Sequence, residues 1–237
     1  MSTYVYGITA AGHPLRLDGV LGVGEPAAPL RTVRSGTLTA VVSDAPPGLR
    51  AKRRDVQAHQ GVIEALMMDG ATLPMRFGLL APDDSEVASA LDAEGEGYLA
   101  RLEELEGHFE YNLKVSREEE DLLREIVQES DRVRELRERT RDGAGTHEER
   151  LELGEIVSNE VTARRDAEAQ RLVEALSSRA KRVSVGEPTA SSLLSVSFLV
   201  SSQEVDSFVQ AVQEQADRRG DAYTFALTGP LPPYSFV

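Results

Sequence analysis

The chain has 237 residues, of which 41% are hydrophobic and 28% are charged, as is ordinary for a globular protein of one large or two small domains. Its net charge of −14 argues against binding to duplex nucleic acid, because phosphate contacts need a concentrated cationic face. Cysteine is absent, which excludes a disulfide scaffold, a thiolate nucleophile and a Cys-ligated zinc site.

The N-terminus has no cationic segment followed by an apolar one, so we expect no signal peptide. No apolar run approaches the ~20 residues that cross a bilayer, so we expect no membrane span. The expected location is therefore the cytoplasm.

The first half predicts a mixture of strands and helices. A strand is expected over 3–9, and two more flank the Ser35-Gly36 turn as a β-hairpin. A helix over 51–69 ends at Gly70. The strand that follows contains Pro74, which places it at a sheet edge or beside a bulge.

Asp83 and Glu86 then form a capping box for a helix that runs to about Glu106. Two glycines, Gly95 and Gly97, each cost it ~1 kcal/mol, so a break is expected there.

The second half is more regular. Alternation of apolar and polar residues over 108–115 predicts a strand, with Glu110 on its polar face. Capping boxes at Ser116 and Ser201 predict helix starts. After the first strand we expect one helix that runs from the Ser116 cap to about 141 and a longer helix over 148–181. Strands over 182–185 and 194–200, a helix ending at Gly220 and a strand over 222–228 follow.

This order is the βαββαβ order of a ferredoxin-like domain, with a helical hairpin inserted in its first crossover. The returning helix exceeds the outgoing one by ~10 residues, as a projecting hairpin requires, because that helix must also run back along the sheet. We therefore expect an α+β chain of two domains, 1–107 and 108–237, with the hairpin at about 117–182.

The sequence contains few patterns typical of a catalytic or cofactor-binding site. The glycines at 19, 22 and 24 do not have the spacing of a dinucleotide-binding loop and precede prolines, which favours a plain loop. The four histidines lie in separate elements without metal-ligand spacing. His59 is interpreted as a packing or capping residue, with a metal or catalytic role as the alternative. We predict no catalytic residue, cofactor or metal.

The charge-dense hairpin has two interpretations. Alternating acids and bases favour a solvated helix pair with i,i+4 contacts, and a partner-binding hairpin is the alternative. The apolar positions Leu122, Ile126, Val133 and Leu136 can form the hairpin's own seam.

The segment Leu73 to Gly78 places a cation within an apolar run. Strand alternation would aim Arg76 away from Met75 and Phe77. Arg76 either braces the domain or belongs to a protein-docking surface. We take Met75, Arg76 and Phe77 as candidate protein-binding residues.

The C-terminal tail, residues 229–237, combines three prolines with Tyr234, Phe236 and Val237. Prolines lower the entropy of the unfolded tail, and the apolar side chains are poorly placed in water. We predict that the tail docks on a folded surface through Tyr234 and Phe236.

Several segments together identify the chain as similar to the GvpF/GvpL family of gas vesicle accessory proteins. The resembling segments are Tyr4 to Ile8, Leu38 to Ser43, His59 with the helix to Leu66, Leu73 to Gly78, and Gly229 to Val237. They occur in the expected order along almost the whole chain, whereas 117–182 shows little that identifies a family.

The resemblance implies a non-enzymatic, gas vesicle-associated role in vesicle assembly, and an N-terminal α+β domain before a modified ferredoxin-like domain. It also implies binding of the small hydrophobic shell protein GvpA, with other gas vesicle accessory proteins as further partners. The apolar surface of such a subunit must be covered by a soluble partner before the subunit polymerises.

Two other classes stay open from the residues alone. One is a small-molecule-sensing module of ferredoxin-like type, which should show a thermal shift with a metabolite. The other is an uncharacterised cytoplasmic enzyme, which should lose activity on change of a single carboxylate.

Overall fold

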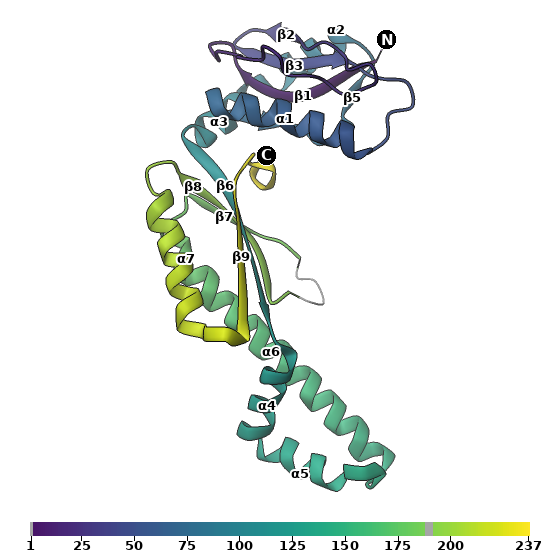
Figure 1. Cartoon of the computed structure of the whole chain (residues 1–237), viewed down its shortest axis with the longest axis vertical. Helices are drawn as coiled ribbons and strands as arrows, with labels where there is room; N and C mark the ends of the chain where they lie inside the picture. Colours follow the sequence, from purple (N-terminus) through teal and green to yellow (C-terminus); the bar gives the residue numbers. More distant parts are fainter. Residues whose placement is uncertain (1, 188–191) are drawn as a thin grey trace. The chain divides into compact units, whose positions relative to one another are not determined.

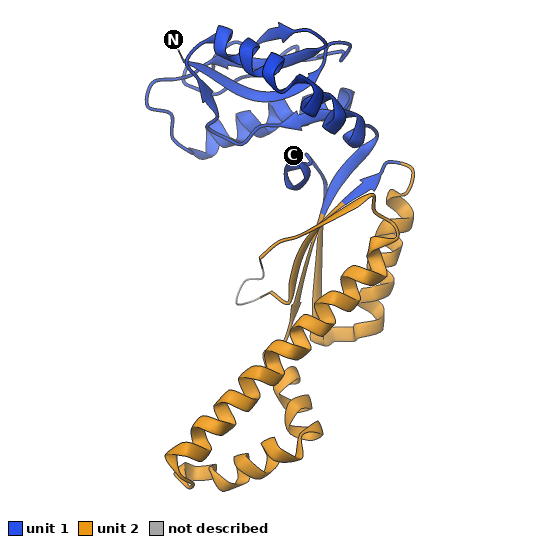
Figure 2. Ribbon diagram, turned by 180° about the vertical axis from the view of Figure 1, so that it is seen from behind, with its two compact units in different colours: residues 1–111, 199–202, 229–237 blue, residues 112–198, 203–228 orange. Residues whose placement is uncertain are grey.

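The computed structural model describes residues 2–187 and 192–237 and confirms a mixed α+β fold (Figure 1). The chain divides into two compact units (Figure 2). Unit 1 comprises 1–111, 199–202 and 229–237, and unit 2 comprises 112–198 and 203–228. The C-terminal tail therefore groups with the N-terminal segment.

Unit 1 contains an antiparallel sheet of strand order β2-β3-β1-β4, with β5 also paired to β1. Helix α1 covers one face, and α2 and α3 cover the other (Figure 1). The elements are β1 (Thr3–Ala10), β2 (Arg31–Ser35), β3 (Leu38–Asp44), α1 (Arg53–Asp69), β4 (Thr72–Pro74), β5 (Leu80–Ala81), α2 (Asp84–Ala93) and α3 (Gly95–Leu105).

A β-bulge in β1 decides which of its side chains meets which helix. Tyr4 and Tyr6 pack in the cluster beneath α1, whereas Val5 lies in the cluster beneath α2 and α3. Strict alternation would put Ile8 with the tyrosines, but the register shifts between Val5 and Gly7, and Ile8 joins Val5. The extra residue thus moves Ile8 from the α1 side of the sheet to the side covered by α2 and α3.

The helix expected from Asp83 to about Glu106 is broken, as the glycines predict. The Asp83 carboxylate accepts from the backbone N–H of Ser85 and Glu86, and α2 ends before Glu94. Helix α3 begins at Gly95.

The second sheet has the strand order β7-β8-β6-β9, and α6 and α7 lie on one of its faces (Figure 1). The rings of Phe198 and Phe208, whose centroids are 5.1 Å apart, pack α7 on the sheet. The elements are β6 (His108–Arg117), α6 (His147–Ser177), β7 (Arg182–Val185), β8 (Leu194–Ser201), α7 (Val205–Arg219) and β9 (Tyr223–Leu231).

The inserted hairpin has two short helices outward and one long helix back. Helices α4 (Glu119–Glu129) and α5 (Asp131–Arg139) meet at Ser130, whose side chain accepts from the Val133 N–H, so the single outgoing helix that we predicted is two. The seam contains Leu122, Ile126 and Val133 against α6. Later along α6, Leu172 and Leu176 are buried, so α6 serves both hairpin and sheet.

Two predicted helix caps do not form. Strand β6 continues through Ser116 to Arg117, and α7 starts after Glu204 without a side-chain cap. The Glu118 N–H, one of the groups that a Ser116 cap would have served, donates instead to the Ala222 carbonyl at 3.0 Å. A capping box that we did not predict, Thr146 with Glu149, forms at the start of α6.

Candidate functional site

The segment after β4 is an interrupted sheet edge in unit 1. The Met75 N–H donates to the Tyr6 carbonyl at 2.8 Å, and pairing resumes where the Val5 N–H donates to the Leu79 carbonyl at 3.1 Å. Because hydrogen-bonding direction alternates along a strand, the nitrogen of Pro74 faces the outer edge, where it offers no donor. A further strand therefore loses a hydrogen bond at this position.

The three candidate residues of this edge point in different directions. Met75 is half-buried and packs against the α2–α3 core. Phe77 is half-buried on the α1 side, its ring centroid 6.0 Å from that of Tyr4 and 5.7 Å from that of His59. Arg76 is exposed, and its guanidinium contacts no other described residue through a hydrogen bond or ion pair.

This arrangement differs from the strand alternation that we expected, because the ladder breaks after Met75. Gly78 has a φ of +89°, which turns the chain in a way that few other residues allow. The exposed apolar side chains of the edge are instead Leu79, 44% exposed, and Leu80, 48% exposed.

His59 holds the inner side of this edge. Its Nε2 lies 3.0 Å from the Met75 carbonyl oxygen, which can only accept, so Nε2 carries a proton. Its Nδ1 then accepts from the Tyr4 hydroxyl at 2.9 Å, and Tyr4 in turn accepts from the Gly78 N–H at 3.2 Å. Both ring nitrogens are used, as expected of a packing residue.

Burial lowers the pKa of His59 and raises that of Tyr4, because desolvation disfavours the charged form of each. The site is therefore a neutral, hydrogen-bonded aromatic cluster.

The C-terminal tail lies in the same unit. After β9 it forms a 3-10 turn, Tyr234–Phe236, rather than an extended chain. Phe236 is 5% exposed and belongs to the cluster that contains Leu102 and Leu105. The Tyr234 hydroxyl lies 3.3 Å from His59 Nε2, and desolvation raises the pKa of this tyrosine to about 12.

Glu110 anchors the tail, a role that the alternation of its strand did not indicate. Its buried carboxylate accepts from the Ser235 N–H at 2.9 Å and from the Ser235 hydroxyl at 2.7 Å. Alternation places Glu110 on the polar face of its strand, and in the structure the returning tail binds it.

Within residues 2–187 and 192–237, no three His, Asp or Glu side chains gather closely enough to hold a metal ion. Over the same residues, no helix combines the length and apolar composition that a bilayer crossing requires.

Comparisons with known proteins agree on one family. Residues 2–237 match the family described as gas vesicle synthesis protein GvpL/GvpF. Gas vesicle protein F of Streptomyces sp. (strain CB03234) is 42% identical over 238 residues and the full length of both chains. Gas vesicle protein L of the same organism is 29% identical, covering 99% of this chain and 92% of the other.

The fold is shared with solved structures. The crystal structure of GvpF from Anabaena sp. PCC7120 superposes with a TM-score of 0.86 at 21% identity, covering 99% of this chain and 97% of that one. The crystal structure of GvpF from Microcystis aeruginosa gives a TM-score of 0.81 at 22% identity. The chain thus belongs to the GvpL/GvpF family of gas vesicle synthesis proteins.

Proposed function

We propose that this protein binds the hydrophobic gas vesicle shell subunit GvpA through its N-terminal domain, residues 1–107, and keeps it soluble for assembly without turnover or cofactor. Family membership gives the chain a gas vesicle role. Beyond that role, we propose binding of GvpA and of other gas vesicle accessory proteins. The physical need is that an apolar subunit aggregates unless a soluble partner covers it.

The observation that carries the proposal is the exposed edge from Arg76 to Leu80. The Arg76 guanidinium is available to hold a carboxylate or backbone carbonyls in a planar fork. Leu79 and Leu80 are exposed beside it. Arginine is enriched in protein interfaces, whose buried centres are also more apolar than the rest of the protein surface.

Met75 and Phe77 support the edge from inside rather than contact the partner. Both are half-buried, and the Met75 carbonyl and the Phe77 ring contact His59. We propose that they hold the edge in shape, and that the shell subunit contacts Arg76 and Leu80 through side chains rather than as an added strand.

The test is co-expression of the full-length protein with GvpA, followed by capture and a melting curve. Arg76→Ala and Leu80→Ser should each lower capture about tenfold at unchanged melting temperature, as expected for side chains at the centre of an interface. Phe77→Ser should lower the melting temperature, because it leaves a cavity beside Tyr4 and His59. Arg34→Ala, at an exposed arginine of β2, is the matched control.

Two outcomes separate the parts of the proposal. If Arg76→Ala and Leu80→Ser capture GvpA as well as the wild type does, the edge is the wrong surface. If the wild-type protein captures no GvpA at all, the proposed function itself is wrong.

A further inference from the structure

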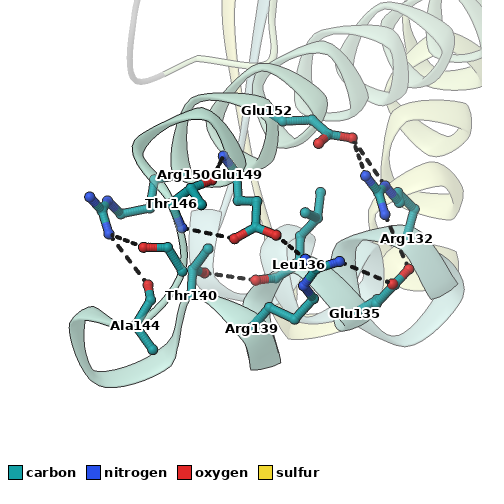
Figure 3. Close-up of polar contacts among 11 residues, drawn as sticks. Arg132, Glu135, Leu136, Arg139, Thr140, Ala144, Thr146, Glu149, Arg150 and Glu152 are labelled. Carbon is teal, nitrogen blue, oxygen red and sulfur yellow. Dashed lines mark hydrogen bonds and ion pairs between the residues drawn. The ribbon is translucent and has the colours of Figure 1, made fainter.

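The arginines on and next to helix α5 differ in whether they are paired with carboxylates. On the side that faces α6, Arg132 Nε donates to Glu152 at 3.1 Å and Nη1 donates to Glu135 at 3.2 Å (Figure 3). Arg139 pairs with Glu149, the capping-box residue at the start of α6 (Figure 3). These cations are neutralised within the hairpin, and they close its tip.

A second set of arginines belongs to α5 and to the turn that follows it. Arg134 and Arg137 lie three residues apart on α5, and Arg141 begins the 3-10 turn Arg141–Gly143 that follows the helix. They line a hollow of about 550 Å³, whose lining residues are Val127, Arg134, Arg137, Glu138, Thr140 and Arg141.

Charge in this hollow is only partly balanced. Arg134 donates to the Asp131 carboxylate and, at 2.8 Å, to the Gln128 carbonyl oxygen. Arg137 and Arg141 are exposed and form no side-chain hydrogen bond or ion pair with any other residue that the structure describes. Two guanidinium groups that line the same hollow are thus left open on a protein whose net charge is −14.

We propose that this hollow binds an acidic segment of a partner protein, which presents two carboxylates to Arg137 and Arg141 and one apolar side chain to Val127. A guanidinium holds a carboxylate through two parallel N–H···O bonds, which gives direction as well as attraction. Val127 is half-buried beside the hairpin seam and supplies an apolar floor. Carboxylates four residues apart on a partner helix are neighbours on its surface, so one helical segment can present both.

Charge also selects against nucleic acid as the occupant. A long polyanion would be repelled by the acidic remainder of the chain, whereas a short acidic segment stays within the hollow, where three arginines outnumber Glu138. The hollow lies in unit 2 and binds an acidic segment, whereas GvpA is hydrophobic. This proposal therefore does not depend on the function proposed above.

The test uses the full-length protein and a fluorescent helical peptide that carries Glu four residues apart with a Leu between them. Arg137→Glu with Arg141→Glu should weaken binding at least tenfold. Arg34→Glu with Arg101→Glu, which changes the net charge equally at exposed sites of unit 1, should leave binding within twofold. Arg137→Lys with Arg141→Lys should give an intermediate loss, because charge is kept but the planar fork is not.

Circular dichroism and melting curves of each variant show whether the hairpin stays folded, as expected for exposed positions. The proposal is overturned if the wild type does not bind the peptide, if a Gln-for-Glu peptide binds equally well, or if both double variants lose binding alike. Tighter binding of single-stranded RNA or of anionic vesicles at these arginines would assign the hollow to another class of partner and would equally overturn it.

Discussion

His59 shows how a single titratable residue can be assigned from its contacts. An unperturbed histidine titrates near pH 6.5, within the range where many functional histidines work. Here Nε2 donates to the Met75 carbonyl and Nδ1 accepts from Tyr4, so protonation would remove the acceptor that Tyr4 needs. His59 therefore holds the segment from Met75 to Gly78 in place while its imidazole ring is neutral.

This contact predicts a pH dependence of stability. Because burial lowers the pKa of His59 in the folded state, the unfolded state binds the proton first as pH falls. Its contribution to stability is complete above about pH 6.5 and decreases as pH falls below that value, by at most ~1.4 kcal/mol per pH unit.

Urea unfolding at pH 5.5 to 7.5 measures the effect. His59→Gln should flatten the dependence, whereas His147→Gln, at an exposed histidine, should retain it. Equal slopes in the wild type and His59→Gln would show that His59 does not carry the effect.

At the scale of elements, a buried ion cluster joins the hairpin to the second sheet within unit 2. Arg117, at the end of β6, donates to Glu168 of α6 and to Glu125 of α4, each at 2.6 Å. The Tyr223 hydroxyl at the start of β9 donates to the same Glu168 at 2.9 Å, and the Arg117 guanidinium lies 5.1 Å from the Tyr223 ring centroid. Four elements thus meet at one arginine.

The cluster predicts a large effect from a single truncation. The Arg117 side chain is 5% exposed, so Arg117→Ala leaves the Glu168 carboxylate largely buried without its cation and should cost about 3–5 kcal/mol. Arg117→Ala combined with Glu168→Gln should recover part of that loss, because no buried charge then remains. Urea unfolding gives both values, and a cost under about 1 kcal/mol for Arg117→Ala would contradict this account.

At the scale of the whole molecule, the chain's two ends belong to one compact unit. The tail contributes Phe236 to a core whose other members include Leu102 and Leu105. Glu110 binds both polar groups of Ser235 beside it.

Removing the tail should therefore destabilise unit 1. Deletion of 234–237 exposes the site of Phe236 and leaves Glu110 without Ser235, for a loss of about 2–4 kcal/mol. The melting temperature should fall by about 5–10 °C. Deletion of Val237 alone, which is 38% exposed, is the control and should have little effect. An unchanged melting temperature after the longer deletion would mean that the docked tail does not stabilise the unit.

Local sequence was sufficient for most elements and for the fold class. Periodicity, capping boxes and glycines act over a few residues, so they predicted the first hairpin, the break at Gly95 and the ferredoxin-like order of the second half. The excess length of α6 could be predicted from the sequence for the same reason.

Long-range contacts decided the rest. The bulge that sends Ile8 to the opposite face from Tyr6, the burial of Glu110 under Ser235, and the separate directions of Met75 and Phe77 all depend on segments far apart in the chain. The division of the arginines on α5 likewise depends on which of them α6 meets. A sequence pattern reports what a residue prefers locally, whereas its burial and partners are set by free energy shared with distant residues, which only the tertiary structure specifies.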